Sequence, residues 1–488
     1  MKESILNLEP KNLWKIFYEI SKVPRPSKKE GKIRAYIKNF AVENSLDFIE
    51  DKAGNICIKI PATKGYENSK TVVLQGHLDM VCEKNKDSNH DFDNDGLKLK
   101  LENNWVKAEG TTLGADNGIG VAAALAIALD KEIEHGPIEI LLTVDEETGL
   151  TGANALSKKM ITGDILLNLD SEEDGAFYVG CSGGIDTQAE FKIPLRNNKN
   201  KINAFRLSVT GLLGGHSGLD IHKNRGNAIK ILALILNKLL QMDLKIANLT
   251  GGSKRNAIPR EAEAIVLVDK SNVKKVKKEF VKIQASFISL FKGKEDNLKI
   301  EFEPIEEKVK KYFKGNFARK IVRTLLALPH GVVSMSADIK DLVETSTNLA
   351  TITRDKNKII IGTSQRSSVE TAKFNLAEIV KAVFELADAD KINTGDGYPG
   401  WKPNMNSKIL SLAKSVYEKE FNSQPEIKAI HAGLECGILS GKFPNLDMIS
   451  FGPTIEGAHS PDERVDVDAV KKFYKLIRLI LIEIASVK

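Results

Sequence analysis

Short apolar runs alternate with helix-like segments in the first part of the chain. The runs at 71–76 (TVVLQG), 138–144 (IEILLTV) and 165–169 (ILLNL) predict buried strands, because they are short, aliphatic and bounded by polar residues. Between the first two lies 116–130 (DNGIGVAAALAIALD), an Ala-rich apolar segment that predicts a helix. Apolar strands that alternate with helices are typical of an α/β sheet with both faces covered.

The pattern changes after about residue 186. Two successive rounds of strands and amphipathic helices follow, similar in make-up but without detectable sequence identity. They indicate an inserted α+β domain, and their similarity suggests a duplication. The predicted elements are strands at 204–209, 262–268 and 298–303, helices at 227–240 and 273–290, then a helix at 321–328, strands at 348–353 and 359–363, and a helix from 369.

The α/β pattern returns near residue 396, with strand-like runs at 426–430 and 446–451. The segment GAHSP with His459 lies in this last part, whereas chemically related segments lie in the first part. The chain must therefore return to its first domain. We predict a discontinuous α/β domain (residues 1–186 and 396–488), built on a mixed sheet flanked by helices, and an inserted α+β domain at 187–395.

Composition narrows the class of protein. A net charge of +6 over 488 residues is a mild excess, and the Lys-rich stretches 274–282 and 308–314 keep apolar residues at helical spacing, so nucleic acid is not an expected partner. The four cysteines form no CxxC pair, no run approaches the ~20 apolar residues of a membrane helix, and the N-terminus lacks a signal-peptide pattern. We expect a cytoplasmic protein that does not contact membranes.

Five short segments, in a fixed order, carry imidazoles and carboxylates. Several of them follow directly on predicted strands, where open α/β sheets place their ligand crevices. Two imidazoles and five carboxylates are enough to hold a pair of divalent ions and to leave one carboxylate as a base. The segments are GHLDM (His77, Asp79), LGADNG (Asp116), DEETG (Glu146, Glu147), NLDSE (Asp170) and GAHSP (His459).

Each of these residues has a structural alternative when it is taken singly. A histidine at a strand end is commonly a core or surface residue, Asp116 fits the N-cap of a helix, and the adjacent Glu146 and Glu147 fit a solvated surface. The alternatives weaken jointly, because buried carboxylates without partners are costly and a metal pair would offset that cost.

Taken together, the motifs HLD, GADNG, DEETG, NLDSE and AHSP resemble the co-catalytic zinc aminoacylase and carboxypeptidase superfamily. Within it, the chain is similar to the bacterial cytosolic dipeptidases that act on aminoacyl-histidine and on a broader range of dipeptides. The resemblance covers essentially the full length, including the insertion, which in that family is a lid. It implies metal-dependent hydrolysis of dipeptides, Xaa-His and carnosine-like ones among them.

The resemblance also implies a ligand set. His77 and Asp170 would bind one ion, Glu147 and His459 would bind the other, and Asp116 would bridge both. The ions would be zinc, with cobalt and manganese as alternatives, because the preferences of such nitrogen and oxygen sites overlap.

Two further residues of the same motifs receive roles by this resemblance. Asp79 would orient the His77 ring through a hydrogen bond. Glu146 would be the general base that takes a proton from the attacking water and passes it to the leaving amine.

The resemblance extends to the insertion. It implies that His216 (GGHSG) stabilises the tetrahedral oxyanion and that Asn256 (KRNAIP) and Arg366 (TSQRSS) bind substrate, Arg366 through the terminal carboxylate of a dipeptide. His431 and Glu435, in HAGLECG of the returning segment, would line the pocket. A loop histidine and a surface arginine remain the structural alternatives for His216 and Arg366. No role is assigned to the other histidines, which are His90, His135, His222 and His330.

Two other functions stay open on the sequence. One is an amidohydrolase of the same superfamily that acts on N-acyl amino acids, since such a metal centre serves any amide. The other is a non-catalytic metal- or peptide-binding protein, although Glu146 and every ligand position are present. The resemblance further suggests a homodimer with a small peptide as substrate.

Overall fold

The computed structural model describes residues 5–198 and 202–487, and the chain forms two compact units. Unit 2 consists of Cys181–Gly400 and Ile430–Gly433, and unit 1 contains the described residues on either side. The insertion thus begins and ends a few residues outside the predicted range 187–395. The short segment Ile430–Gly433 belongs to unit 2 because it is hydrogen-bonded to that unit: the backbone N–H of Ser182 donates to the carbonyls of Ile430 and Ala432. His431 therefore belongs to unit 2, not to the returning α/β segment.

Unit 1 is built on a mixed eight-stranded sheet. Its centre is parallel, with β6, β3, β7 and β21 side by side, and antiparallel strands flank it. Every residue of β3, β6 and β7 is buried, as expected for parallel strands covered on both faces. In sheet order the strands are β1 (Asp47–Glu50), β2 (Ile56–Ile60), β6 (Ile138–Thr143), β3 (Val72–His77), β7 (Ile165–Asn168), β21 (Asp447–Ser450), β8 (Ala176–Cys181) and β20 (Glu426–Ile430).

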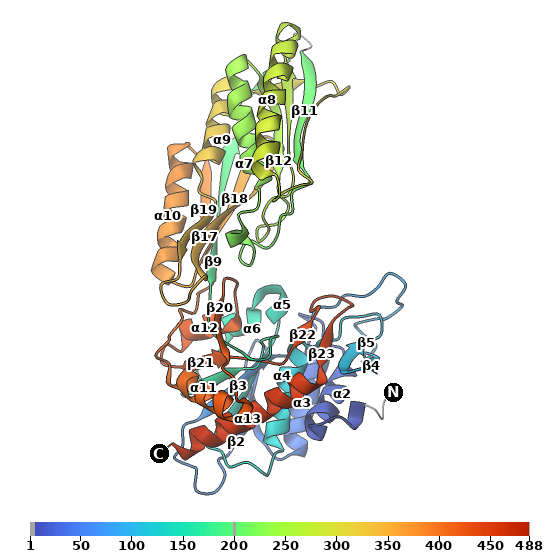
Figure 1. Ribbon diagram of the computed structural model, residues 1–488, viewed down its shortest axis with the longest axis vertical. Coiled ribbons are helices and arrows are strands. Elements are labelled where there is room, and N and C mark those ends of the chain that lie inside the picture. The colour runs from blue at the N-terminus through green and yellow to red at the C-terminus, as the bar shows by residue number, and fades with distance from the viewer. Residues whose placement is uncertain (1–4, 199–201, 488) are drawn as a thin grey trace. The chain divides into compact units, whose positions relative to one another are not determined.

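Helices cover this sheet, and Figure 1 shows α13 running beside α11 along it. The central helix α4 packs on β3 and β6, and its small apolar residues are buried nearly all round. Because no side of this helix faces solvent, polar residues would be buried on it, which explains why nearly all of its residues are small and apolar. The helices of unit 1 are α2 (Lys11–Ser21), α3 (Gly31–Glu43), α4 (Ala115–Ala128), α5 (Glu146–Gly149), α6 (Thr151–Ala155), α11 (Lys408–Phe421), α12 (Glu435–Lys442) and α13 (Val467–Ser486).

A second, small sheet in unit 1 fixes the loop that carries His459. Strand β23 pairs with both β22 and β5, and the residues between β22 and β23 form this loop. The order of the sheet is β22 (Ile455–Glu456), β23 (Arg464–Asp466), β5 (Trp105–Ala108) and β4 (Leu99–Glu102).

Unit 2 contains one nine-stranded sheet made of two similar halves. Each half has the chain order strand, helix, strand, strand, helix, strand, and in each the fourth strand lies beside the first, followed by the third and the second. The inner half is β11 (Asn203–Thr210), α7 (Ala228–Leu239), β12 (Lys245–Gly251), β13 (Ala262–Val268), α8 (Val273–Phe291) and β14 (Lys299–Pro304). The outer half is β9 (Gly183–Lys192), α9 (Gly315–Ala327), β17 (Val343–Asp355), β18 (Lys358–Ser367), α10 (Glu370–Leu386) and β19 (Lys391–Thr394).

The two halves join through their second strands, β12 and β17, which pair antiparallel. The inner half is inserted between β9 and α9 of the outer half, and the paired strands β10 (Leu195–Asn197) and β15 (Lys311–Phe313) close the insertion. A short strand, β16 (Gly331–Met335), adds to β17. The four helices pack on the sheet over one continuous hydrophobic core (Figure 1).

The predicted fold class, an α/β domain with an inserted α+β domain, is confirmed. Strands β3, β6, β7 and β13 agree with the predicted ranges to within one residue at each end. The pattern missed β12 and placed the start of α9 six residues late, because its first turn begins with Gly315 and Asn316, which are weak helix formers. Within residues 5–198 and 202–487, no helix combines the length and apolar character needed to cross a bilayer.

Candidate metal centre

The imidazoles and carboxylates of the five sequence motifs converge at one edge of the unit 1 sheet. His77 is the last residue of β3, Glu146 and Glu147 open the short helix that follows β6, and Asp170 follows β7. Parallel strands end at the same edge, so these side chains meet although they are distant in sequence. Asp116 joins them from the first turn of α4.

Asp116 lies between the two histidines. Its Oδ1 is 3.0 Å from His77 Nε2, and its Oδ2 is 3.2 Å from His459 Nε2. Each histidine also has a carboxylate of its own, since Asp170 Oδ1 lies 3.3 Å from His77 Nε2 and Glu147 Oε2 lies 3.1 Å from His459 Nε2. Two groups of three ligands therefore share one carboxylate.

This arrangement fits a pair of divalent ions. Glu147 Oε1 is a buried oxygen without a hydrogen bond, so it offers a free lone pair where an ion would need it. The ligand atoms of His77, Asp116 and Asp170 lie within 4.8 Å of one another, and so do those of Asp116, Glu147 and His459. Imidazole nitrogens and carboxylate oxygens are the donors that zinc and related ions bind.

The charges of the site point the same way. Hydrogen bonds that the His459 ring donates to the carboxylates of Asp116 and Glu147 raise the pKa of His459 to about 11. Burial lowers the pKa of His77, but the carboxylates of Asp170 and Asp116 outweigh it and hold that pKa well above its usual value. Burial raises the pKa of Asp170 to about 6, against the opposing effect of His77. Without ions, protons therefore occupy the positions between the acids and the imidazoles.

Asp79 is placed to orient His77 and the helix that carries the two glutamates. Its Oδ1 lies 3.4 Å from His77 Nδ1 and accepts the backbone N–H of Glu146. Its Oδ2 accepts the Ser27 hydroxyl and the backbone N–H of Glu147. Burial alone would raise the pKa of Asp79, but the bond to His77 and these donors lower it to about 2. The carboxylate is thus ionised and directs His77 Nε2 toward Asp116.

Glu146 has the surroundings of a base that can hold a proton. Its carboxylate lies within 4.8 Å of ligand atoms of His77 and Glu147. Burial raises the pKa of Glu146 well above its usual value; His77 opposes this increase, and Asp170 adds to it. A carboxylate with a raised pKa matches the task of accepting and returning a proton near neutral pH.

Two residues that support this site were not predicted. Both oxygens of the buried Glu463 accept backbone N–H groups of the loop 113–116 that carries Asp116. The buried Arg25 donates to the carbonyls of Leu78, Asp79 and Gly114, which ties the His77 segment to the same loop. Glu463 lies four residues after His459, a spacing that could have drawn attention to it. No sequence signal marks Arg25.

The predicted residues of the insertion form a separate cluster within unit 2. The buried Arg366 donates to the hydroxyl of Tyr398, and the buried His431 lies 2.7 Å from the Ser346 hydroxyl. Burial and the charge of Arg366 lower the pKa of His431 to about 3 and also lower that of His216. Arg366 is therefore not the surface arginine of the structural alternative.

His216 and Asn256 occupy adjoining loops. The backbone N–H groups of Gly218 and Leu219 donate to His216 Nδ1, so the neutral ring carries its proton on Nε2. The side chain of Asn256 is exposed, and the backbone carbonyl of Asn256 accepts the backbone N–H of Ser217.

The four histidines without a predicted role stand apart from the metal ligands. His90 packs edge-on against Phe92, and His135 Nδ1 lies 2.7 Å from the carbonyl of Gly136. Burial lowers the pKa of His330 to about 4, and His222 lies in a single 3-10 turn.

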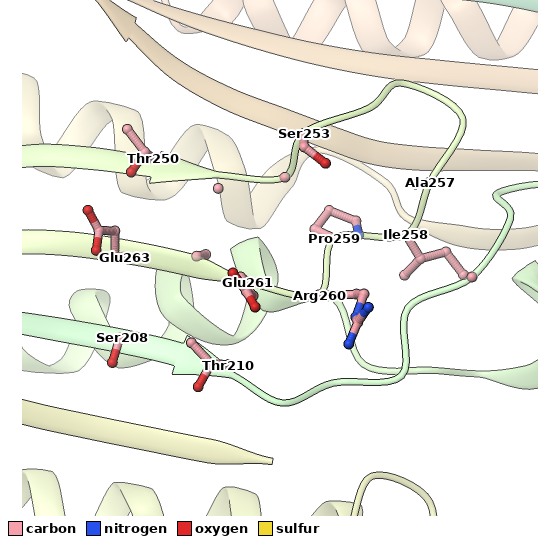
Figure 2. A pocket seen from close by; sticks show the side chains of 14 residues that line it. Ser208, Thr210, Thr250, Ser253, Ala257, Ile258, Pro259, Arg260, Glu261 and Glu263 are labelled. Carbon is pink, nitrogen blue, oxygen red and sulfur yellow. The ribbon is translucent and has the colours of Figure 1, made fainter. Parts of the chain in front are cut away.

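The prominent cavities lie away from the predicted site, and one of about 790 Å³ in unit 1, beside Tyr66 and Ile409, is lined by none of the predicted site residues. A cavity of about 560 Å³ lies in unit 2, and Figure 2 shows Ser208, Thr210, Thr250 and Glu263 along three neighbouring strands of it. None of the predicted site residues lines this cavity. The ligand geometry in unit 1 is the more specific indication of chemistry.

Comparison with known proteins places the chain in a family. The sequence profile of peptidase family M20/M25/M40 matches residues 73–483, which include all five motifs. The chain belongs to this family. It is 41% identical over 480 residues to the cytosol non-specific dipeptidase of Escherichia coli, covering 98% of this chain and 99% of that protein.

Solved structures agree with the family assignment. The aminoacylhistidine dipeptidase of Vibrio alginolyticus superimposes with a TM-score of 0.91 at 42% identity, over 99% of both chains. Aminopeptidase PepT of Bacillus cereus shares the fold, with a TM-score of 0.60 at 18% identity over 98% of this chain and all of that one. The family resemblance predicted from the motifs is confirmed.

Proposed function

We propose that this M20/M25/M40 peptidase is a metal-dependent dipeptidase, which cleaves Xaa-His and other dipeptides. One observation carries the proposal: Asp116 lies between His77 and His459, and each histidine has a second carboxylate beside it. The Escherichia coli and Vibrio alginolyticus relatives named above are dipeptidases over nearly the same length of chain, which supports the substrate class.

The residues fit two divalent ions, one held by His77 and Asp170, the other by Glu147 and His459, with Asp116 shared. When bound, such a pair supplies an acidified water and polarises the scissile carbonyl. Zinc suits this donor set, and cobalt or manganese would also fit it.

The chain's own residues then move the protons. Glu146 accepts the proton of the attacking water on its carboxylate and donates it to the amine that leaves. Asp79 keeps His77 in one orientation and holds the backbone of Glu146 and Glu147 in place through two hydrogen bonds.

Residues of unit 2 would complete recognition of the substrate. The Nε2–H of neutral His216 is a suitable donor for a developing oxyanion. Arg366 keeps a buried Nε without a partner, which a dipeptide carboxylate could satisfy. His431 and Asn256 are proposed to contact substrate as well. We further propose that the protein acts in the cytoplasm, in keeping with the name of the Escherichia coli relative, and that it forms a homodimer.

A substrate panel on metal-reconstituted protein tests the function. Dipeptides with and without C-terminal histidine are assayed beside N-acetyl amino acids, before and after chelation. We expect chelator-sensitive hydrolysis of dipeptides. Turnover of N-acetyl amino acids alone would identify the amidohydrolase instead, and metal binding without any turnover would identify a binding protein.

A further inference from the structure

A fully buried carboxylate lies beneath the metal ligands. Glu435 is the first residue of α12 and has no exposed surface, so it does not line a pocket as the sequence suggested. Its Oε2 accepts hydrogen bonds from Gln75 Nε2 (2.6 Å) and from the Thr143 hydroxyl (2.7 Å). Both donors are buried as well.

These donors connect Glu435 to the strands that carry metal ligands. Gln75 lies two residues before His77 on β3, so the two side chains share a face of the sheet. Thr143 is the register partner of His77 across β6 and β3. Gln75 also accepts the side-chain amide of Asn168, which lies two residues before Asp170. The Glu435 carboxylate therefore lies one layer below His77 and Asp170.

When ionised, Glu435 carries a negative charge that no lysine or arginine of the described residues neutralises, and the cationic group that acts on it is the ring of His77. No lysine or arginine within residues 5–198 and 202–487 forms an ion pair with it, and its buried Oε1 accepts no hydrogen bond. Burial raises the pKa of Glu435 to about 7, and nearby His77 opposes this increase. An isolated buried carboxylate is costly, so a compensating positive charge is expected close by.

We propose that Glu435 is a positioning residue of the metal centre, whose carboxylate strengthens binding of the ion held by His77 and Asp170. It would do so by attraction across one layer of side chains and by fixing the ends of β3 and β6. The bound ion is in turn the missing counter-charge. This inference rests on the proposed metal-dependent function.

Substituting Glu435 by glutamine separates charge from shape. The glutamine oxygen can still accept from Gln75 and Thr143, while its amide occupies the position of the unpartnered Oε1. Removal of the charge should lower the affinity for one of the two ions about 10- to 100-fold, which is the usual effect of losing a residue that supports a metal ligand. The melting temperature of the metal-free protein should stay the same or rise, because an uncompensated buried charge is gone.

Glu139→Gln is the matched control. Glu139 is equally an acid of the unit 1 sheet and 3% exposed, but it lies four residues before Thr143 on β6, roughly 13 Å away along the strand. Among the described residues, its carboxylate accepts hydrogen bonds from Thr162 and Gly163 alone. We expect the metal affinity of the Glu139→Gln variant to remain within about 3-fold of that of the unsubstituted chain. This change is well below the one expected from losing a residue that supports a metal ligand.

Competition with a chromophoric chelator measures both zinc affinities, and circular dichroism follows the melting of the chelated proteins. Glu435→Met, of similar volume and uncharged, is a second neutral variant in case E435Q does not fold. Weaker binding of one ion in a folded neutral variant, without loss of metal-free stability, supports the inference. Unchanged affinity in such a variant overturns it, as does an equal loss in E139Q. If the unsubstituted chain binds no zinc, the proposed function itself fails.

Discussion

Asp79→Asn should weaken metal binding and destabilise the metal-free protein, because Asp79 serves several donors at once. Oδ1 accepts the Glu146 N–H at 3.0 Å and lies 3.4 Å from His77 Nδ1, and Oδ2 accepts Ser27 at 2.8 Å and the Glu147 N–H at 3.2 Å. Asparagine keeps one acceptor oxygen and presents N–H groups to the other donors. The Glu147 N–H would then face a donor instead of an acceptor.

The size of the effect on stability follows from the pKa of Asp79. That pKa falls from 3.8 to about 2 on folding, and the side chain has no exposed surface. A tenfold change in an acid dissociation constant corresponds to about 1.4 kcal/mol, so the ionised carboxylate contributes about 2 kcal/mol to the free energy of unfolding at neutral pH. Loss of the His77 orientation should also reduce metal affinity about 10- to 100-fold.

Urea unfolding of the chelated proteins and chelator competition measure the two effects. Because the pKa of Asp79 is lowered, its contribution is complete well above pH 3.8 and disappears as the pH falls toward 2. The two proteins should differ at neutral pH and converge in acid. A D79N protein that binds both ions as tightly as the unsubstituted chain would refute the assigned role of Asp79.

Three further predictions concern the same site. Glu146→Ala should bind zinc with unchanged stoichiometry but lose about 100- to 10,000-fold in kcat, because it lacks the proton acceptor; full activity would remove Glu146 from the mechanism. Glu463→Gln should lower the melting temperature and the metal affinity, because two of the four backbone N–H groups in the Asp116 loop lose their acceptor. Hydrogen exchange at residues 113–116 measures the loss. Unchanged exchange there would show that the loop does not depend on Glu463. Asp116 and Glu147 raise the pKa of His459 to about 11, so an ion that binds His459 must displace a proton. Metal affinity should therefore increase between about pH 6 and pH 9, and binding should release protons that can be measured. A pH-independent affinity would contradict this.

The convergence of several proposed ligands at one edge of the sheet could be predicted from the apolar runs that precede them. His77, Glu146 and Asp170 each follow an apolar run, and the rule that parallel strands share one carboxyl edge brings them together without any coordinates. His459 needed a different argument, since only the return of the chain to its first domain could place it near Asp116. The motif order supplied that argument.

The supporting residues could not be predicted in the same way. Arg25 acts through carbonyl groups of Leu78, Asp79 and Gly114, and backbone carbonyls leave no mark on the sequence. Glu435 was expected to line a pocket from its place in the returning segment, whereas it is fully buried and its hydrogen-bond partners lie on β3 and β6. Partners of this kind become visible only when long-range pairing is known.

The nesting of the fold sets an order for its formation. The inner half of unit 2 is continuous in sequence and pairs β11 with β13 and β14, so it can form soon after its synthesis. Strand β9 must wait for β18, which lies more than 150 residues later, and the helix α13 closes unit 1 last. Since Asp116 and His459 are separated by 343 residues, the proposed shared ligand meets its second histidine only after His459 has been synthesised. We expect nascent chains to carry a folded insertion while they still lack a metal centre, so metal loading must wait until the chain extends past His459.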